Sequence, residues 1–135
     1  MASRQELEFH LMQVVDVVPT ALFMLDDTHA VTHWNLACER LTKIGADRMI
    51  GSRDPWRAFH DRPRPLLANM VIDGVSDNVM RALFGEEVRP SLETAGGWEV
   101  VSYNEVLKRR LLIAAVPLLD LDGRVVGALQ TAREA

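Results

Sequence analysis

The sequence predicts an α+β domain built on one antiparallel sheet, with short helices between the two halves of that sheet. Residues 20–34 have the pattern of two strands joined by an acidic turn, and residues 98–131 have the pattern of three more strands. Between them, residues 36–85 carry apolar side chains at helical spacing, interrupted by glycines and prolines. Strands followed by helices and then by a strand meander are typical of an α+β fold.

Length and composition are those of one globular domain. The chain has 135 residues, of which 48% are hydrophobic and 25% charged, and this is enough for a single core. No apolar run approaches the ~20 residues that cross a bilayer, and charged residues stand where a secretory signal would be apolar. We therefore expect a cytoplasmic protein without direct membrane insertion. The net charge of −4 argues against a nucleic-acid partner.

Residues 4–17 are predicted to form an amphipathic helix that ends before Pro19. Phe9 and Met12 widen its apolar stripe. Such a stripe either docks on its own domain or packs against a second copy of the chain. We expect segment 1–18 to be a dimerisation helix preceding a domain over 19–135, with a homodimer contact formed by Leu7, Leu11, Val14, Val15 and Val18.

The first strand, at residues 20–25, is apolar on both faces, so both faces are expected to be covered. Asp26, Asp27 and Thr28 supply turn chemistry before a second strand at residues 30–34. Asn35 then fits the N-cap of a helix over residues 36–43, and Gly45 fits its end.

The middle third predicts three further short helices. One helical turn is expected at residues 47–50 and another helix at residues 77–85, while Pro63 and Pro65 are suited to opening a helix between them. The last third predicts strands at residues 98–103, 111–119 and 125–131. Pro117 lacks a backbone N–H, so it is expected at the end of its strand or where the strand loses a partner.

The order of these elements, with the segments 34–42 and 117–134, resembles a PAS domain, the sensory module of bacterial signalling proteins. Residues 51–74 are similar to a PAS subgroup attached to histidine kinases, diguanylate cyclases and chemoreceptors. The similarity rests on Trp56, Ala58 and Phe59, an Arg-Pro pair and a closing Asp-Gly; the sequence departs from the pattern at His60, where an aromatic hydroxyl is usual.

The resemblance implies a five-stranded antiparallel sheet in the order 2-1-5-4-3, with short helices on one face that enclose a pocket. It implies a sensory role rather than an enzyme, dimerisation through the helix before the first strand, and an output kinase, cyclase or chemoreceptor domain in a parent protein. Strand parity and family position predict a small-molecule pocket lined by Phe23, Trp34, Trp56, Phe59, His60, Met70, Met80, Leu112 and Ala114.

Two alternatives stay open beside the ligand sensor. In the first, the same apolar residues fill the core of a ligand-free dimerisation module. In the second, His60 is the axial ligand of a bound haem. A cysteinyl-flavin adduct is not expected, because Cys38 lies in the helix after the second strand rather than in the cysteine motif of a helix that borders flavin.

The sequence offers no metal or catalytic constellation. His29 and His33 fall across a turn and a strand, so their spacing does not place them on one face. The single cysteine excludes a multi-cysteine zinc site. The four carboxylates in the strand connections, Asp26, Asp27, Asp120 and Asp122, fit turn formers better than an acid–base pair. A small α+β enzyme of another fold is therefore the weakest interpretation.

Overall fold

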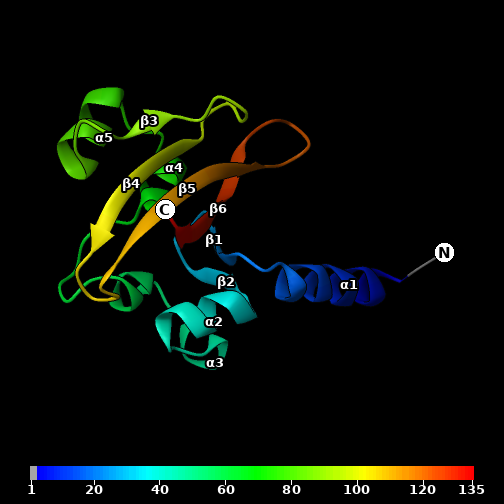
Figure 1. Cartoon of the computed structure of the whole chain (residues 1–135). Coiled ribbons are helices and arrows are strands. Elements are labelled where there is room, and N and C mark those ends of the chain that lie inside the picture. The colour runs from blue at the N-terminus through cyan, green and yellow to red at the C-terminus, as the bar shows by residue number, and fades with distance from the viewer. Residues whose placement is uncertain (1–2) are drawn as a thin grey trace.

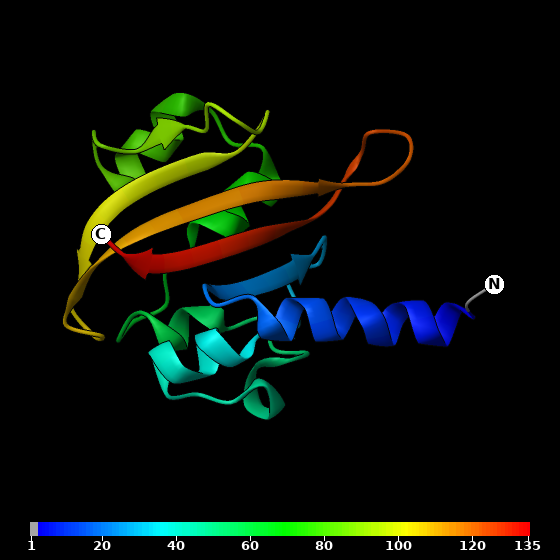
Figure 2. The ribbon, with the colours of Figure 1, turned by 45° about the vertical axis from the view of Figure 1, so that its right-hand side comes forward.

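The computed structural model describes residues 3–135, which form one antiparallel sheet with helices packed against it (Figures 1 and 2). The first half consists of α1 (Arg4–Val17), β1 (Ala21–Asp26), β2 (Val31–Trp34), α2 (Leu36–Thr42), α3 (Ala46–Met49) and the 3-10 helix η1 (Pro55–Ala58). The second half consists of α4 (Leu67–Asp73), α5 (Asp77–Phe84), β3 (Arg89–Pro90), β4 (Trp98–Asn104), β5 (Arg109–Leu119) and β6 (Val125–Glu134).

The strands lie in the order β2-β1-β6-β5-β4-β3. The five strands expected from the sequence keep the order 2-1-5-4-3, so the predicted fold class and topology are confirmed. The sixth strand was missed because it has only two residues, too few for periodicity, and one of them is Pro90. Pro117 still faces β6 but lies beyond Ala115, the last β5 residue that pairs with β4, as expected for a residue without a ladder donor.

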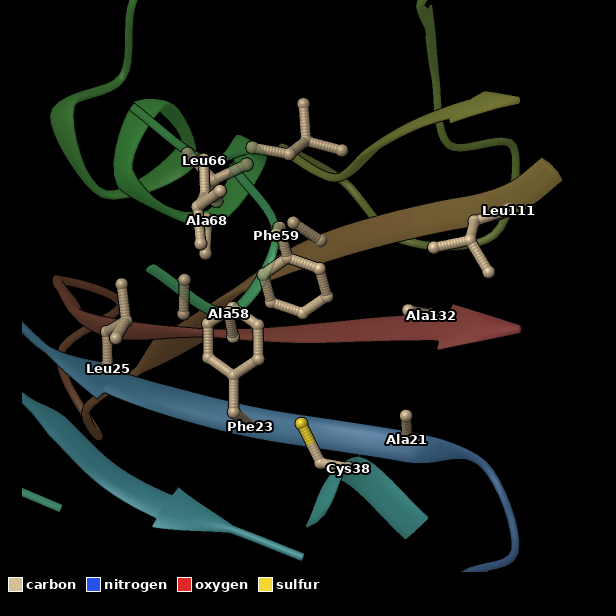
Figure 3. Close-up of a cluster of buried hydrophobic side chains, with 14 of the residues drawn as sticks. Ala21, Phe23, Leu25, Cys38, Ala58, Phe59, Leu66, Ala68, Leu111 and Ala132 are labelled. Carbon is tan, nitrogen blue, oxygen red and sulfur yellow. The ribbon is translucent and has the colours of Figure 1, made fainter. Parts of the chain in front are cut away.

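Side chains alternate between two faces of the sheet. On the inner face, Ala115 lies between Trp98 of β4 and Gln130 of β6, and this face contacts the helices. Figure 3 shows the core that results, where Phe23 and Leu25 of β1 meet Ala58, Phe59 and Ala68 from the helical segment. The opposite, outer face carries half-buried apolar residues that include Met24, Leu112 and Leu129.

The helix α1 begins where predicted, with Ser3 Oγ accepting a hydrogen bond from the Glu6 backbone N–H. In both ribbon views it leaves the domain beside β2 and its amino-terminal part extends past the sheet (Figures 1 and 2). Val15 is 5% exposed and packs into its own domain, whereas Leu7, Leu11 and Val14 are 58%, 50% and 59% exposed. Residues 1 and 2 of the expected segment 1–18 lie outside the described residues.

Asn35 joins α1, β1 and α2 through one fully buried side chain. Its Oδ1 accepts from the backbone N–H of Cys38 at 2.9 Å, which is the predicted N-cap bond, and also from Leu22 N–H at 2.9 Å. Its Nδ2 donates to three backbone carbonyls, those of Val15, Val18 and Thr20 at 3.1, 3.3 and 3.0 Å. The capping residue therefore also fixes the end of α1 to the sheet.

Two helix boundaries differ from the sequence prediction. The helix α2 ends at Thr42 and is capped by Lys43, whose φ of 62° is left-handed, while Gly45 instead precedes α3 as its N-cap. The helix α4 begins at Leu67, so Pro63 and Pro65 lie before it in an irregular segment. The side chain of Asn69 accepts from the Leu66 N–H at 2.8 Å and takes the role expected of the prolines in starting that helix.

Candidate functional site

Three aromatic residues of the predicted pocket pack against one another. The rings of Phe23 and Trp34 are 5.3 Å apart between centroids, and Phe59 lies 6.0 and 6.4 Å from them. All three are buried. The Trp34 indole N–H donates to the Ile44 carbonyl at 3.0 Å, which satisfies its polar atom. Phe23 and Trp34 thus form core, the arrangement expected of the filled-core alternative in this part of the domain.

A cavity of about 400 Å³ opens beside this cluster. We call it the main cavity. It lies between the segment 59–67, the end of α5, the β4–β5 hairpin and β6. Of the predicted residues, Phe59 and His60 line it. The sequence did not single out the other apolar lining residues, which include Leu66, Leu67, Phe84, Val100 and Ile113.

Met70 and Met80 line a different hollow of about 410 Å³, together with Val75, Trp98 and Pro117. The predicted pocket therefore divides into two spaces and a packed aromatic cluster. Trp56 lines neither space: its indole N–H donates to Asp54 Oδ1 at 3.3 Å, and the Arg57 guanidinium lies 5.5 Å from the ring centroid.

The prediction that Leu112 and Ala114 face the pocket was wrong. Both lie on the outer face, where Leu112 is opposite Val101 and Ala114 is opposite Glu99. Because side chains alternate along a strand, their neighbours Leu111, Ile113 and Ala115 point to the helices. Residues 111–116 are apolar on both faces, so no alternation of apolar and polar residues marks which set points inward.

Gln130 is the polar residue at the buried end of the main cavity. It is 2% exposed, and its Oε1 accepts from the Ala68 N–H at 2.9 Å. Its Nε2 has no hydrogen-bond partner among residues 3–135. No completely buried side-chain nitrogen or oxygen of these residues lacks a partner, so this amide nitrogen reaches the cavity surface. The sequence carries no signal for this role, because β6 also holds the polar residues Thr131, Arg133 and Glu134 and a single amide does not stand out among them.

Charged residues surround the mouth of the main cavity. His60 is half-buried there, and burial lowers the pKa of its imidazole. The charge of Arg64 lowers that pKa further, while the weaker effect of Asp61 raises it. Arg64 Nη2 donates to the Leu83 carbonyl at 3.3 Å, which holds the guanidinium over the end of α5. Arg62 and Glu105 complete the rim.

The domain is an antiparallel sheet with helices on one face and a cavity between them. A comparison of the sequence with protein families agrees with this fold. Residues 15–135 match the family model described as "PAS fold". The chain belongs to the PAS family. A comparison with curated proteins finds no match.

Solved structures share this PAS fold at low sequence identity. The PAS domain of BvgS from Bordetella pertussis is 15% identical, with 96% of this chain and 85% of that chain covered and a TM-score of 0.57. A LOV protein from Rhodobacter sphaeroides is 14% identical over 98% and 68% of the two chains, also at 0.57. The PAS domain of nitrogen regulation protein NR(II) from Vibrio parahaemolyticus is 15% identical over 93% and 97%, at 0.53. At these identities the likeness shows the fold alone.

The histidine His29 has a structural role in this PAS domain. Its Nδ1 accepts from Asn69 Nδ2 at 2.8 Å and its Nε2 donates to Asp73 Oδ1 at 2.9 Å, so the β1–β2 turn is joined to α4. No cluster of three or more histidine, cysteine or acidic residues within positions 3–135 could hold a metal ion. Cys38 is buried, and burial raises the pKa of its thiol, which keeps it protonated.

Two of the four turn carboxylates bond to their own turns. Asp26 Oδ1 accepts from the hydroxyl and N–H of Thr28, and these bonds lower the pKa of the carboxyl group. Asp120 Oδ1 accepts from the N–H groups of Asp122 and Arg124, each at 2.9 Å. Both carboxylates are thereby used as turn formers. In the part of the chain that the structure describes, no helix is long and apolar enough to cross a membrane.

Proposed function

We propose that this PAS domain is a sensory module that binds a small ligand in the main cavity. PAS domains are in general sensory and non-catalytic modules, and no reaction is assigned to this chain. The signal would pass through dimerisation, or to a kinase, cyclase or chemoreceptor domain of a parent protein. The single observation that carries the proposal is the free amide nitrogen of Gln130, a buried polar group that lines the main cavity.

The size and lining of the main cavity support this proposal over the filled-core alternative. Ligand sites are typically concave, mostly apolar spaces of about 300–1,000 Å³ with a few well-placed polar groups, and the main cavity has about 400 Å³. Phe23 and Trp34 fill the adjacent part of the core, so the main cavity lies on the far side of Phe59 from them.

A thermal-shift screen against carboxylic acids and aromatic compounds tests this function. Binding to the native state is expected to raise Tm by about 10 °C at a concentration near 100 times Kd, since ligand binding adds to the free energy of unfolding. Ile113→Phe, which narrows the main cavity, should abolish the shift. The matched control Val75→Phe narrows the second hollow and should retain it.

The absence of a shift for every compound would instead favour the ligand-free dimerisation module. An absorption spectrum of the same purified protein tests the haem alternative. A Soret absorption band that is lost in His60→Ala would assign haem to His60, whose imidazole is kept neutral by burial and by Arg64.

We also propose that the exposed stripe of α1 forms a homodimer contact. Leu7, Leu11 and Val14 remain uncovered, whereas Val15 is occupied by its own domain and Val18 is half-buried. Leu11→Asp should therefore yield a particle of 15.1 kDa by light scattering, in place of one near twice that mass. Gln13→Asp, on the opposite side of α1, should leave the mass unchanged. A wild-type mass of one chain would exclude this interface.

A further inference from the structure

The rim of the main cavity offers unpaired positive groups to a ligand. Arg62 and Arg64 line the mouth, and neither forms an ion pair with any carboxylate of residues 3–135. Arg64 uses a single N–H on the Leu83 carbonyl. A guanidinium has five N–H donors and no acceptor, so the remaining donors at this edge have no partner within the described chain.

Two acidic residues, Asp61 and Glu105, share the rim, so the sign of the local potential has to be decided. His60 also lines the cavity, and the charges of Arg64 and Asp61 both act on its imidazole. Arg64 lowers the pKa of this imidazole more than Asp61 raises it. Of these two charges the positive one prevails at His60, and because Arg62 and Arg64 form no ion pair among residues 3–135, the rim favours an anionic group.

The other end of the cavity requires a different group. Gln130 is held in place because its Oε1 accepts from the Ala68 N–H, and its unpartnered Nε2 is accessible where the residue lines the cavity. A donor without a partner discriminates against a ligand that covers it and lacks an acceptor, since that ligand would leave the donor unpaired. The rest of the lining includes the apolar residues Leu66, Leu67 and Val100, beside the polar residues Ser102 and Asn104.

We infer that the ligand of the main cavity is a small amphipathic carboxylate with a carbonyl or hydroxyl acceptor at its far end. The carboxylate binds the guanidinium groups of Arg64 and Arg62, the apolar body fills the space beneath α4 and α5, and the acceptor takes a hydrogen bond from Gln130 Nε2. This inference rests on the proposed function, because it names the chemistry of the same site.

Three matched compounds test the inference by calorimetric titration of the full chain. The first is para-acetyl-hydrocinnamate, which carries a carboxylate, an aromatic body and a far carbonyl. The second is its methyl ester, which lacks the charge, and the third is para-ethyl-hydrocinnamate, which lacks the carbonyl. The first compound should bind about tenfold or more tightly than either of the other two, as expected for one lost charge-assisted or buried hydrogen bond.

Variants assign the two ends. Arg64→Gln should lower the affinity for the first compound about tenfold and leave the affinity for the ester unchanged. Arg48→Gln, on the exposed surface of α3, should change neither affinity. Gln130→Met should lower the affinity for the first compound to that for the ethyl analogue. Unchanged binding of the ethyl analogue by Gln130→Met serves as the folding check, because Ala68 loses its acceptor in that variant.

The outcomes separate this inference from the function on which it rests. An ester that binds as tightly as the acid, or an Arg64→Gln variant that weakens both equally, would overturn the carboxylate assignment while leaving the cavity a ligand site. If none of the three compounds binds while neutral compounds from the wider screen do bind, the carboxylate assignment would also be overturned. Failure of every compound in both experiments would remove the proposed function itself.

Discussion

Replacing Asn35 by aspartate is expected to lower the free energy of unfolding by about 3–5 kcal/mol, the cost of an uncompensated buried charge. Asparagine and aspartate are equally good N-caps, so the bonds from Cys38 and Leu22 would survive. The loss comes from Nδ2, which donates to three carbonyl groups. A carboxylate there faces three acceptors with no donor, in a fully buried site.

The pH dependence of this variant follows from the same geometry. Burial and the three carbonyls disfavour the charged form, so the pKa of the new carboxyl group is raised above its value of about 3.9 in the unfolded chain. The penalty is therefore complete above the folded-state pKa and shrinks as the pH falls toward the unfolded value. Urea unfolding at pH of about 8 and about 5 should show a smaller deficit at the lower pH.

Asn78→Asp is the matched control for Asn35→Asp. Asn78 is exposed in the first turn of α5, where a negative charge is tolerated, so this variant should change stability by less than about 0.5 kcal/mol. If Asn35→Asp were as stable as Asn78→Asp, the Nδ2 bonds would contribute nothing to the link between α1 and the sheet.

Gly127→Ala is expected to cost about 3 kcal/mol, the upper end of the usual overpacking range. A Cβ added at Gly127 would collide with the backbone carbonyl of Leu25 in the neighbouring strand β1. The obstacle is main chain inside a ladder, so relief requires moving β1 or β6 rather than turning a side chain. Chemical denaturation of both proteins measures the difference.

The control for Gly127→Ala is Gly123→Ala in the turn between β5 and β6. Gly123 has a φ of +80° but open space around the position of a Cβ, so that variant carries only the backbone strain of about 1–2 kcal/mol. The comparison therefore separates the cost of the steric clash between β1 and β6 from the cost of giving alanine a positive φ. An equal or smaller loss for Gly127→Ala would show that the strands can part at little cost.

Most of the architecture could be predicted from local signals. Asn35 and the turn of Asp26 and Thr28 act through bonds to residues a few positions away, and such bonds depend on short stretches of chain. The helix over Arg4–Val17 follows from the spacing of its apolar residues. The family resemblance then supplied the strand order, which no local pattern contains, and the sheet confirms it.

The site could be predicted only in part. Family position predicts Phe59 and His60 at the pocket, and both line the main cavity. Leu112 and Ala114 were misplaced because β5 is apolar on both faces and its parity is set by pairing with β4 and β6. Gln130 was overlooked, since one amide in a strand carries no signal until its neighbours across the fold are known.

The sequence by itself therefore determined the elements, their caps and turns, and through the resemblance the order of the sheet. The tertiary structure decided which aromatic residues are core, which face of β5 points inward, and that Gln130 and Arg64, from distant parts of the chain, border the same cavity. The physical reason is the separation along the chain of the residues that interact. Caps, turns and periodicity depend on neighbours within a few residues, whereas a cavity is defined by side chains that only long-range strand pairing and helix packing bring together.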